Sequence, residues 1–312
     1  MHVESTSVAG RVRAFALSPA WFLRLVALEL FALWLIVATG AAVRLTDSGL
    51  GCEHWPGCEA GHPLPAKDYH AFIEFGNRLV GGVTILLTLL VAAAAWWTPL
   101  GRGGRRLAVA LFAGTLAQAP LGYLAVQTDL RWPVVAAHLL LSMLLIAGAV
   151  VLVFLAYERV RGSAEALVPR ELQRLGVGVA VAGLALLVSG SLATAAGPHS
   201  GGGTEHVERL ARLEPVVYAH AGTVAVFGCS FLFLLGYLAA RRSRAPRLFL
   251  ASLGVLGILL AQAGLGELQY RLHLPWYLVL LHVALAATAW LGVVALVTAF
   301  WRPPASLAPA PT

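Results

Sequence analysis

Charged side chains are scarce in this sequence. Asp, Glu, Lys and Arg make up 12% of its 312 residues, whereas soluble domains carry roughly 25%. The shortage excludes an ordinary soluble protein. A net charge of +7 accompanies it, but the basic residues lie in short segments between apolar runs. That distribution sets membrane topology and does not indicate nucleic-acid binding.

Eight apolar runs are each long enough to cross about 30 Å of hydrocarbon. They cover approximately residues 21–43, 72–98, 107–127, 133–156, 175–196, 215–239, 247–270 and 275–300. They predict an all-α integral membrane protein with no soluble domain. The first run is expected to be a retained helix, because it shows no convincing cleavage site for a signal peptide. The Pro/Ala-rich stretch 303–312 is expected to be disordered.

Arginine is concentrated in alternate loops between these runs. One side holds Arg11, Arg13, Arg102, Arg105, Arg106, Arg159, Arg161, Arg170, Arg174, Arg241, Arg242, Arg244, Arg247 and Arg302. The loops of the other side are poor in Arg and richer in Asp and Glu. The positive-inside rule therefore predicts that both termini are cytoplasmic.

Cysteine is rare, with three in the chain. Cys52 and Cys58 share the first external loop, GCEHWPGCEA, where an oxidising compartment favours a disulfide. A metal site with His54 and His62 is the alternative, although a C-x5-C spacing is no standard zinc clamp. Cys229 lies inside the sixth run and is expected to be a small buried residue.

The chain contains a tandem repeat. LAQAPLG and LAQAGLG recur 144 positions apart, and the same shift matches Gln118 with Gln262, Gly122 with Gly266 and His138 with His282. VATGAAVRLTDSGLG also resembles LVSGSLATAAGPHSGG. Four spans per repeat predict two parallel four-helix bundles, residues 1–160 and 161–312, related by a pseudo-twofold axis along the membrane normal.

Of ten histidines, three fall inside the spans: His138, His220 and His282. Each lies a few residues from an external span end, which places all three imidazoles about 8–10 Å below that surface. Two facing imidazoles at one level suit a six-coordinate haem. In the first repeat, Asn77 and His138 occupy the matching helices. Interhelical hydrogen bonding is the alternative role for such histidines.

VRLTDSGLGCEHWPGC and IEFGNRLVG, together with GPHSGG and the three histidines, resemble the heme A synthase family over essentially the whole chain. The resemblance implies oxidation of the C8 methyl of heme O to a formyl group, giving heme A for cytochrome oxidase. It makes His220 and His282 the axial ligands of a heme b cofactor in the second half. It also implies that His138 faces the substrate heme O, that Glu74 is the catalytic carboxylate, and that Cys52 and Cys58 form a disulfide.

One residue departs from the family pattern. Asn77 stands where the second-helix motif usually has His, as in actinobacterial-type members. An amide is a weak iron ligand, so His138 alone is expected to hold the substrate iron, with Asn77 orienting a water or hydroxyl. His70 is the other candidate ligand, but it would lie about 10 Å above Asn77. We expect it to be an interface or entry residue.

Three further residues are expected at the substrate or cofactor. Arg78 follows Glu74 at i, i+4 and can hold its carboxylate or meet a heme propionate. Arg44 and His199 are the other propionate candidates. Glu74 is expected to accept a proton as the methyl is oxidised, through successive hydroxylation to a gem-diol that loses water. A self-contained Glu74–Arg78 ion pair at a helix end is the alternative.

The sequence has no flavin or nicotinamide fingerprint, so an external electron-transfer partner is expected, with the heme b relaying electrons. The family also implies a bacterial plasma membrane, and contact with the heme O-forming farnesyltransferase and cytochrome oxidase assembly factors. Two other functions remain open. A diheme cytochrome b would need a histidine pair in each half, against which Asn77 counts. A transporter would need broken helices near the bilayer middle, for which Gly81-Gly82 and Pro120 are the candidate breaks.

Overall fold

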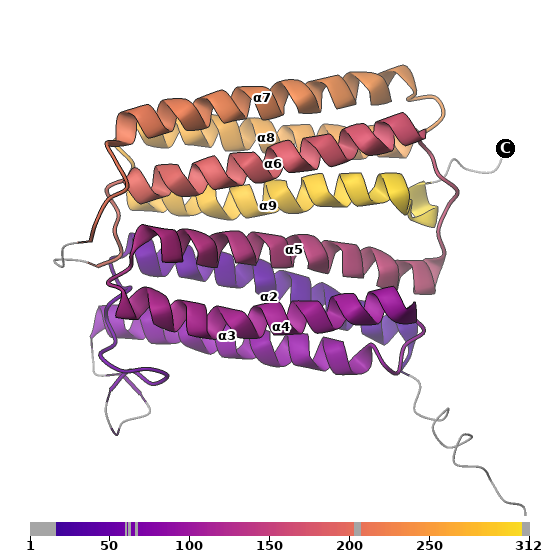
Figure 1. Cartoon of the computed structure of the whole chain (residues 1–312). Coiled ribbons are helices and arrows are strands. Elements are labelled where there is room, and N and C mark those ends of the chain that lie inside the picture. The colour runs from indigo at the N-terminus through magenta and orange to yellow at the C-terminus, as the bar shows by residue number, and fades with distance from the viewer. Residues whose placement is uncertain (1–16, 60, 62–63, 66–67, 203–206, 308–312) are drawn as a thin grey trace, which may run out of the picture.

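A computed structural model describes residues 17–59, 61, 64–65, 68–202 and 207–307. In these residues the chain forms long helices that run nearly parallel or antiparallel to one another (Figure 1). They are α2 (Pro19–Leu45), α3 (Tyr69–Ala94), α4 (Gly101–Gln127), α5 (Trp132–Arg161), α6 (Arg170–Ala196), α7 (Leu213–Ala240), α8 (Pro246–Arg271) and α9 (Trp276–Trp301), followed by a short 3-10 turn, η1 (Ala305–Leu307).

All eight long helices are long and apolar enough to cross a membrane. Large apolar side chains remain exposed on their surfaces, among them Leu86, Val181 and Phe233. Exposed apolar surface of this extent needs lipid or another partner to cover it. The prediction of an all-α, multi-pass membrane protein is therefore confirmed.

The helix ends follow local chemistry that hydropathy does not measure. Asp68 caps α3, because its carboxylate accepts a hydrogen bond from the Ala71 amide at 3.0 Å. Proline occupies the first turn of α2, α5 and α8, where its missing N–H costs nothing. α4 begins at Gly101, so Arg102, Arg105 and Arg106 lie in its first turns and not in a loop.

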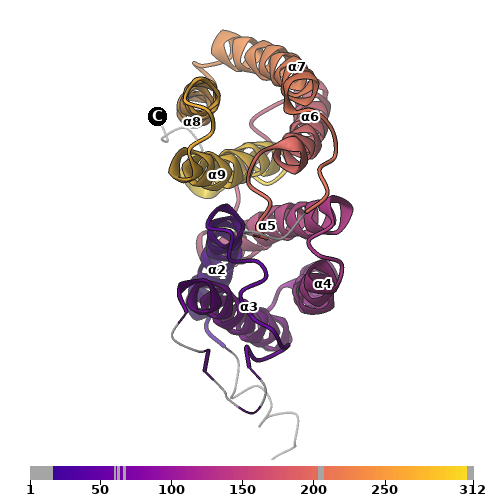
Figure 2. The same cartoon turned by 90° about the vertical axis from the view of Figure 1, so that its left-hand side faces the viewer.

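The helices form two rings of four, which Figure 2 shows nearly end-on. In the first ring α2 packs on α3, α3 on α4, α4 on α5 and α5 on α2; the second ring repeats this order with α6 to α9. The rings meet where α2 and α5 contact α9 and where α5 contacts α6. The pseudo-twofold axis between them stays a prediction.

Side chains from both rings share hydrogen bonds at this junction. The Trp34 indole on α2 donates to Thr288 Oγ1 on α9 at 3.0 Å. The Trp290 indole on α9 donates to the Met143 carbonyl on α5 at 2.8 Å. Trp290 also belongs to the same buried cluster as the first ring's core.

Two details differ from the sequence expectations. α3 and α4 run unbroken through Gly81-Gly82 and Pro120, so neither is the discontinuous helix that a transporter would need. Residues 303–307, expected to be disordered, are ordered here: the Ala164 amide donates to the Pro303 carbonyl, and Ser306 bonds to Tyr157. Arg11, Arg13 and residues 308–312 lie outside the described residues.

Candidate functional site

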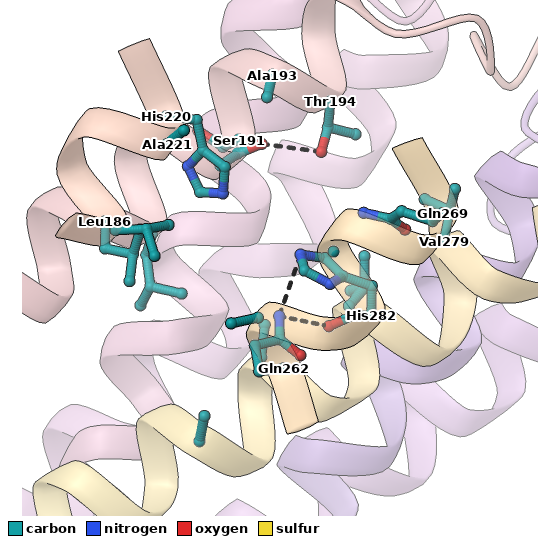
Figure 3. Close-up of a pocket in the computed structure, with 18 of the residues that line it drawn as sticks. Leu186, Ser191, Ala193, Thr194, His220, Ala221, Gln262, Gln269, Val279 and His282 are labelled. Carbon is teal, nitrogen blue, oxygen red and sulfur yellow. Dashed lines mark hydrogen bonds between the residues drawn. The ribbon is translucent and has the colours of Figure 1, made fainter. Parts of the chain in front are cut away.

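The second ring encloses a cavity of about 520 Å³, lined mainly by apolar side chains from α6, α7, α8 and α9. Leu139 and Met143 of α5 also contribute to its wall. The volume falls in the usual range for a cofactor pocket. His220 from α7 and His282 from α9 both line it, and Figure 3 shows the two imidazoles turned toward the same space.

Ser189 orients the His220 imidazole. Its hydroxyl lies 2.8 Å from His220 Nδ1 and 2.6 Å from the Thr223 hydroxyl. Nδ1 is thereby engaged, while Nε2 has no hydrogen-bond partner among the described residues. An imidazole fixed through Nδ1 presents Nε2 to a metal, which is the usual arrangement of a ligating histidine.

Gln262 on α8 contacts His282 twice. Its amide nitrogen lies 3.1 Å from the His282 carbonyl oxygen and 3.1 Å from His282 Nε2. His282 Nδ1 is buried and has no partner in the described chain. Glycine makes room for both imidazoles. A Cβ at Gly190 would come within 3.2 Å of His220 Cε1, and a Cβ at Gly266 would come within 3.0 Å of His282 Cε1.

These residues fit a haem. Two neutral nitrogen donors come from facing helices, the wall is apolar, and Gln262 Oε1 and Gln269 Oε1 are buried polar atoms without partners in the described chain. No cluster of three or more His, Cys, Asp or Glu side chains that could hold a bare metal ion occurs among the described residues. The donor set therefore suits an iron porphyrin better than a zinc or copper ion.

The first ring repeats the same framework around different residues. The Thr39 hydroxyl donates to Asn77 Oδ1 at 2.8 Å, as Ser189 contacts His220. The Gln118 amide donates to the His138 carbonyl oxygen at 3.1 Å, as Gln262 does to that of His282. A Cβ at Gly122 would come 3.6 Å from His138 Cε1. Asn77 therefore occupies the place of His220.

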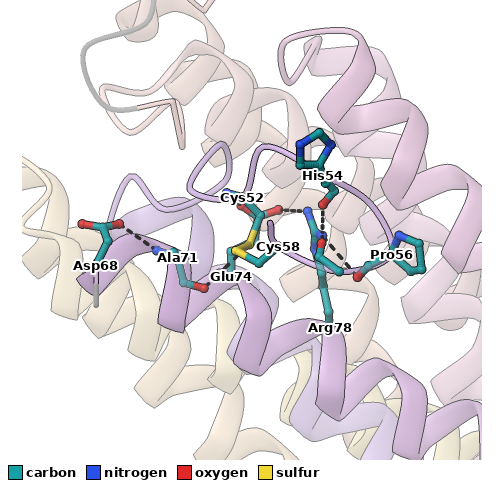
Figure 4. The surroundings of a disulfide bond; sticks show 9 residues. Cys52, His54, Pro56, Cys58, Asp68, Ala71, Glu74 and Arg78 are labelled. Atoms are coloured by element: carbon teal, nitrogen blue, oxygen red, sulfur yellow. Dashed lines mark hydrogen bonds and ion pairs between the residues drawn. A yellow bond between two sulfur atoms is a disulfide. The ribbon is translucent and has the colours of Figure 1, made fainter. Parts of the chain in front are cut away.

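Glu74 and Arg78 fasten the first external loop onto α3 (Figure 4). Glu74 is 5% exposed; its Oε1 lies 2.5 Å from Arg78 Nη2, and its Oε2 accepts from the Cys52 amide at 2.9 Å. Arg78 Nη1 donates to the carbonyls of His54, at 2.7 Å, and Gly57. Arg78 thus holds both the carboxylate and the loop.

A disulfide joins Cys52 to Cys58 in that loop. The sequence favoured this pairing over the metal site with His54 and His62; His62 lies outside the described residues. Cys229 was expected to be buried but is exposed on α7. The expectation was wrong because hydropathy cannot tell the lipid-facing side of a helix from its core side.

The external loops of the two rings are bonded to each other. Arg44, at the end of α2, donates from Nε to the His199 carbonyl and from Nη2 to the Thr194 carbonyl, both at 3.1 Å. The Gly49 amide donates to the Gly201 carbonyl at 2.8 Å. The His199 imidazole contacts the Leu274 carbonyl at 2.8 Å and lines the cavity mouth.

The family model described as cytochrome oxidase assembly protein (COX15-CtaA) matches residues 23–198, more than half of the chain. The chain belongs to this family. It is 32% identical over 142 residues to a heme A synthase of Bacillus pumilus, covering 45% of this chain and 46% of the relative. It is 39% identical over 117 residues to a heme A synthase of Symbiobacterium thermophilum, covering 35% and 36%. The chain thus spans less than half the length of these curated relatives.

The match to the cytochrome oxidase assembly family ends before His220 and His282. It includes Glu74, Asn77 and His138 of the first ring. The case for the second-ring site therefore rests on its own geometry and on the internal repeat.

Sequence reasoning missed several residues that shape the sites. It did not single out Thr39, Ser189 or Gly190. The signal was present, because the repeat of VATG and LVSG matches Thr39 with Ser189 and Gly40 with Gly190. His70 lies at the exposed start of α3, with Nδ1 3.0 Å from the Ser48 hydroxyl. Its role as an entry residue stays a prediction.

Proposed function

We propose that this chain oxidises the C8 methyl of heme O to a formyl group, forming heme A for cytochrome oxidase. The heme O is the substrate of the first ring, and the second ring holds a heme b. Family membership and relatives named heme A synthase support this reaction.

One difference between the repeats carries the proposal. A shift of 143 positions matches Asn77 with His220, Glu74 with Val217 and Arg78 with Ala221. Val217 and Ala221 both line the second-ring cavity. The same framework therefore bears a carboxylate and a guanidinium in the first ring where the second has only apolar side chains. This supports a reacting porphyrin in the first ring and a held one in the second.

In the second ring, His220 and His282 would hold the heme b iron. Such a haem supplies one-electron transfer when bound. Ser189 keeps the His220 ring in one orientation by engaging Nδ1, and the apolar wall excludes water. Leu139 and Met143, from the helix that carries His138, form the part of that wall nearest the first ring.

In the first ring, His138 would supply the axial nitrogen to the substrate iron. Thr39 engages Asn77 Oδ1, which leaves the amide N–H groups to donate toward a water or hydroxyl beside the methyl. Each of two hydroxylations takes its oxygen from that water and releases two electrons, which the external partner accepts, and two protons, one of which Glu74 accepts. The resulting gem-diol loses water to give the aldehyde. Arg78 positions the Glu74 carboxylate.

The arrangement of charges supports a cytoplasmic location of both termini. The Arg-rich helix ends lie at the same end of the bundle as the last turn of α9, opposite the disulfide loop (Figure 1). We place the protein in a bacterial plasma membrane, where it passes electrons to an external partner and contacts the heme O-forming farnesyltransferase and oxidase assembly factors. Heme O and heme A are too apolar to travel freely through water.

The test is to identify the porphyrins that copurify with the chain from cells with and without heme O production. Glu74→Ala should abolish heme A while heme b remains, because only the substrate site loses its base. His220→Ala should lose the heme b. Glu158→Gln, which alters an ion pair with Arg302 away from both sites, is the control and should change neither. Unchanged pigments in both site variants, or a colourless wild-type chain, would reject the proposal.

A further inference from the structure

The matched glutamines on α4 and α8 share one contact. Gln118 and Gln262 each donate from the amide nitrogen to the carbonyl oxygen of the facing histidine, His138 or His282, at 3.1 Å. A carbonyl oxygen can only accept. This bond therefore fixes which end of each amide faces the histidine.

The second N–H of each amide makes a different bond in the two rings. In the first ring it points to the Ser142 hydroxyl, with the nitrogen 2.7 Å from Oγ. In the second ring the nitrogen lies 3.1 Å from Nε2 of His282 itself. The shift of 144 positions matches Ser142 with Ala286, which has no hydroxyl to offer. The two glutamine contacts therefore differ where the two repeats differ, at Ser142 and Ala286.

The bond to Nε2 has a consequence for metal binding. Because the amide nitrogen donates, Nε2 must accept, and its lone pair is engaged. The imidazole proton then belongs on Nδ1, which is buried without a partner in the described chain. An iron ligand needs the same lone pair.

We propose that Gln262 is a positioning residue that competes with the porphyrin iron for His282 Nε2, and that Ala286 permits the competition. The inference rests on the proposed heme b in the second ring. Iron ligation requires the Gln262 amide to turn away from the His282 imidazole, while its bond to the His282 carbonyl oxygen can remain. In the first ring Ser142 removes this competition, because it accepts the second N–H of Gln118 and leaves the His138 imidazole free of it.

The test measures how fast heme leaves the purified full-length chain for an excess of apomyoglobin, followed by absorbance. Ala286→Ser should draw the amide away from Nε2, as Ser142 does, and slow heme loss by about 2- to 10-fold, the worth of one net hydrogen bond. Gln262→Leu should slow it in the same direction. The low-spin spectrum should persist in both variants, because both histidines remain.

A purely structural role for Gln262 predicts the opposite pattern. Gln262→Leu would then speed heme loss, because the bond to the His282 carbonyl is gone, and Ala286→Ser would have no effect; this pattern would overturn the inference. Ala251→Ser adds the same hydroxyl on an exposed position of α8 that does not line the cavity, and it should leave the rate unchanged. A chain without porphyrin, or one whose porphyrin survives His282→Ala, would overturn the proposed function as well.

Discussion

At the scale of single residues, Asn77 would decide how the first ring holds a porphyrin under the proposed function. It occupies the place of His220 and receives the matching hydroxyl contact from Thr39. Asn77→His should restore a second axial imidazole, whose Nδ1 Thr39 can engage. We expect the porphyrin content of the purified chain to rise roughly twofold with a low-spin spectrum, and heme A formation to fall, because six-coordinate haem is held at both faces.

The double variant Asn77→His/His138→Ala is the control for this gain. It should return the porphyrin content to the wild-type level, because the added imidazole again has no partner across the site. An unchanged content in Asn77→His alone would show that residue 77 does not face a porphyrin.

Glu29 has no part in the proposed chemistry. It lies on α2, fully buried, and both of its carboxyl oxygens lack a hydrogen-bond partner in the described chain. A buried polar group without a partner costs about 1–3 kcal/mol. Glu29→Met keeps the unbranched shape and should raise the midpoint temperature of thermal unfolding in detergent. Glu158→Met, which removes a partly exposed ion pair, should not; a lower midpoint for Glu29→Met would reveal a partner for this carboxyl.

At the scale of elements, α3 and the disulfide loop behave as one unit because Arg78 bonds to both. Lysine at position 78 keeps the charge but loses the planar fork that reaches the Glu74 carboxylate and the loop carbonyls together. Hydrogen bonds to charged groups contribute about 1.5–3 kcal/mol each. Arg78→Lys should therefore make residues 52–58 more sensitive to limited proteolysis and lower heme A formation.

Arg271 offers a matched control. It pairs with Glu267 at the same i, i+4 spacing, with its Nε 2.6 Å from Glu267 Oε1, but its side chain is 75% exposed. Exposed pairs contribute about 0–1 kcal/mol. Arg271→Lys should change neither proteolysis nor product. Equal effects of the two substitutions on proteolysis and product would mean that the buried Glu74–Arg78 pair stabilises the loop no more than an exposed pair would.

Elements also show how far sequence reasoning reaches. Hydropathy predicted all eight spans, since each apolar run is longer than the membrane requires. It misplaced the start of α4 by about a turn and a half, because Arg102, Arg105 and Arg106 lower the hydropathy of residues that are still helical. The histidine positions and the repeat predicted that His138, His220 and His282 belong to two matched sites, and their roles as ligands stay predictions. The contacts of Ser189 and Gln262 could not be predicted, because they depend on how neighbouring helices are rotated against each other.

At the scale of the whole molecule, Arg44 joins the two rings. The sequence offered it as a propionate ligand, whereas its Nε and Nη2 donate to the carbonyls of His199 and Thr194 in the second ring. Arg44→Gln should leave at least one of these carbonyls unpaired, at a cost of about 1–3 kcal/mol. We expect a lower midpoint of thermal unfolding, whether or not the chain carries porphyrin.

A propionate ligand would behave differently. Arg44→Gln would then weaken porphyrin retention and leave the unfolding of the porphyrin-free chain unchanged. Arg209 separates the two cases, because the hydrogen bond that it donates, to the Pro198 carbonyl, stays within the second ring. Arg209→Gln should therefore loosen the external loop without uncoupling the rings. Circular dichroism should show one unfolding transition for Arg209→Gln and two for Arg44→Gln, because the Arg44 side chain donates two hydrogen bonds across the junction at the external end, whereas the hydrogen bond of Arg209 stays within the second ring.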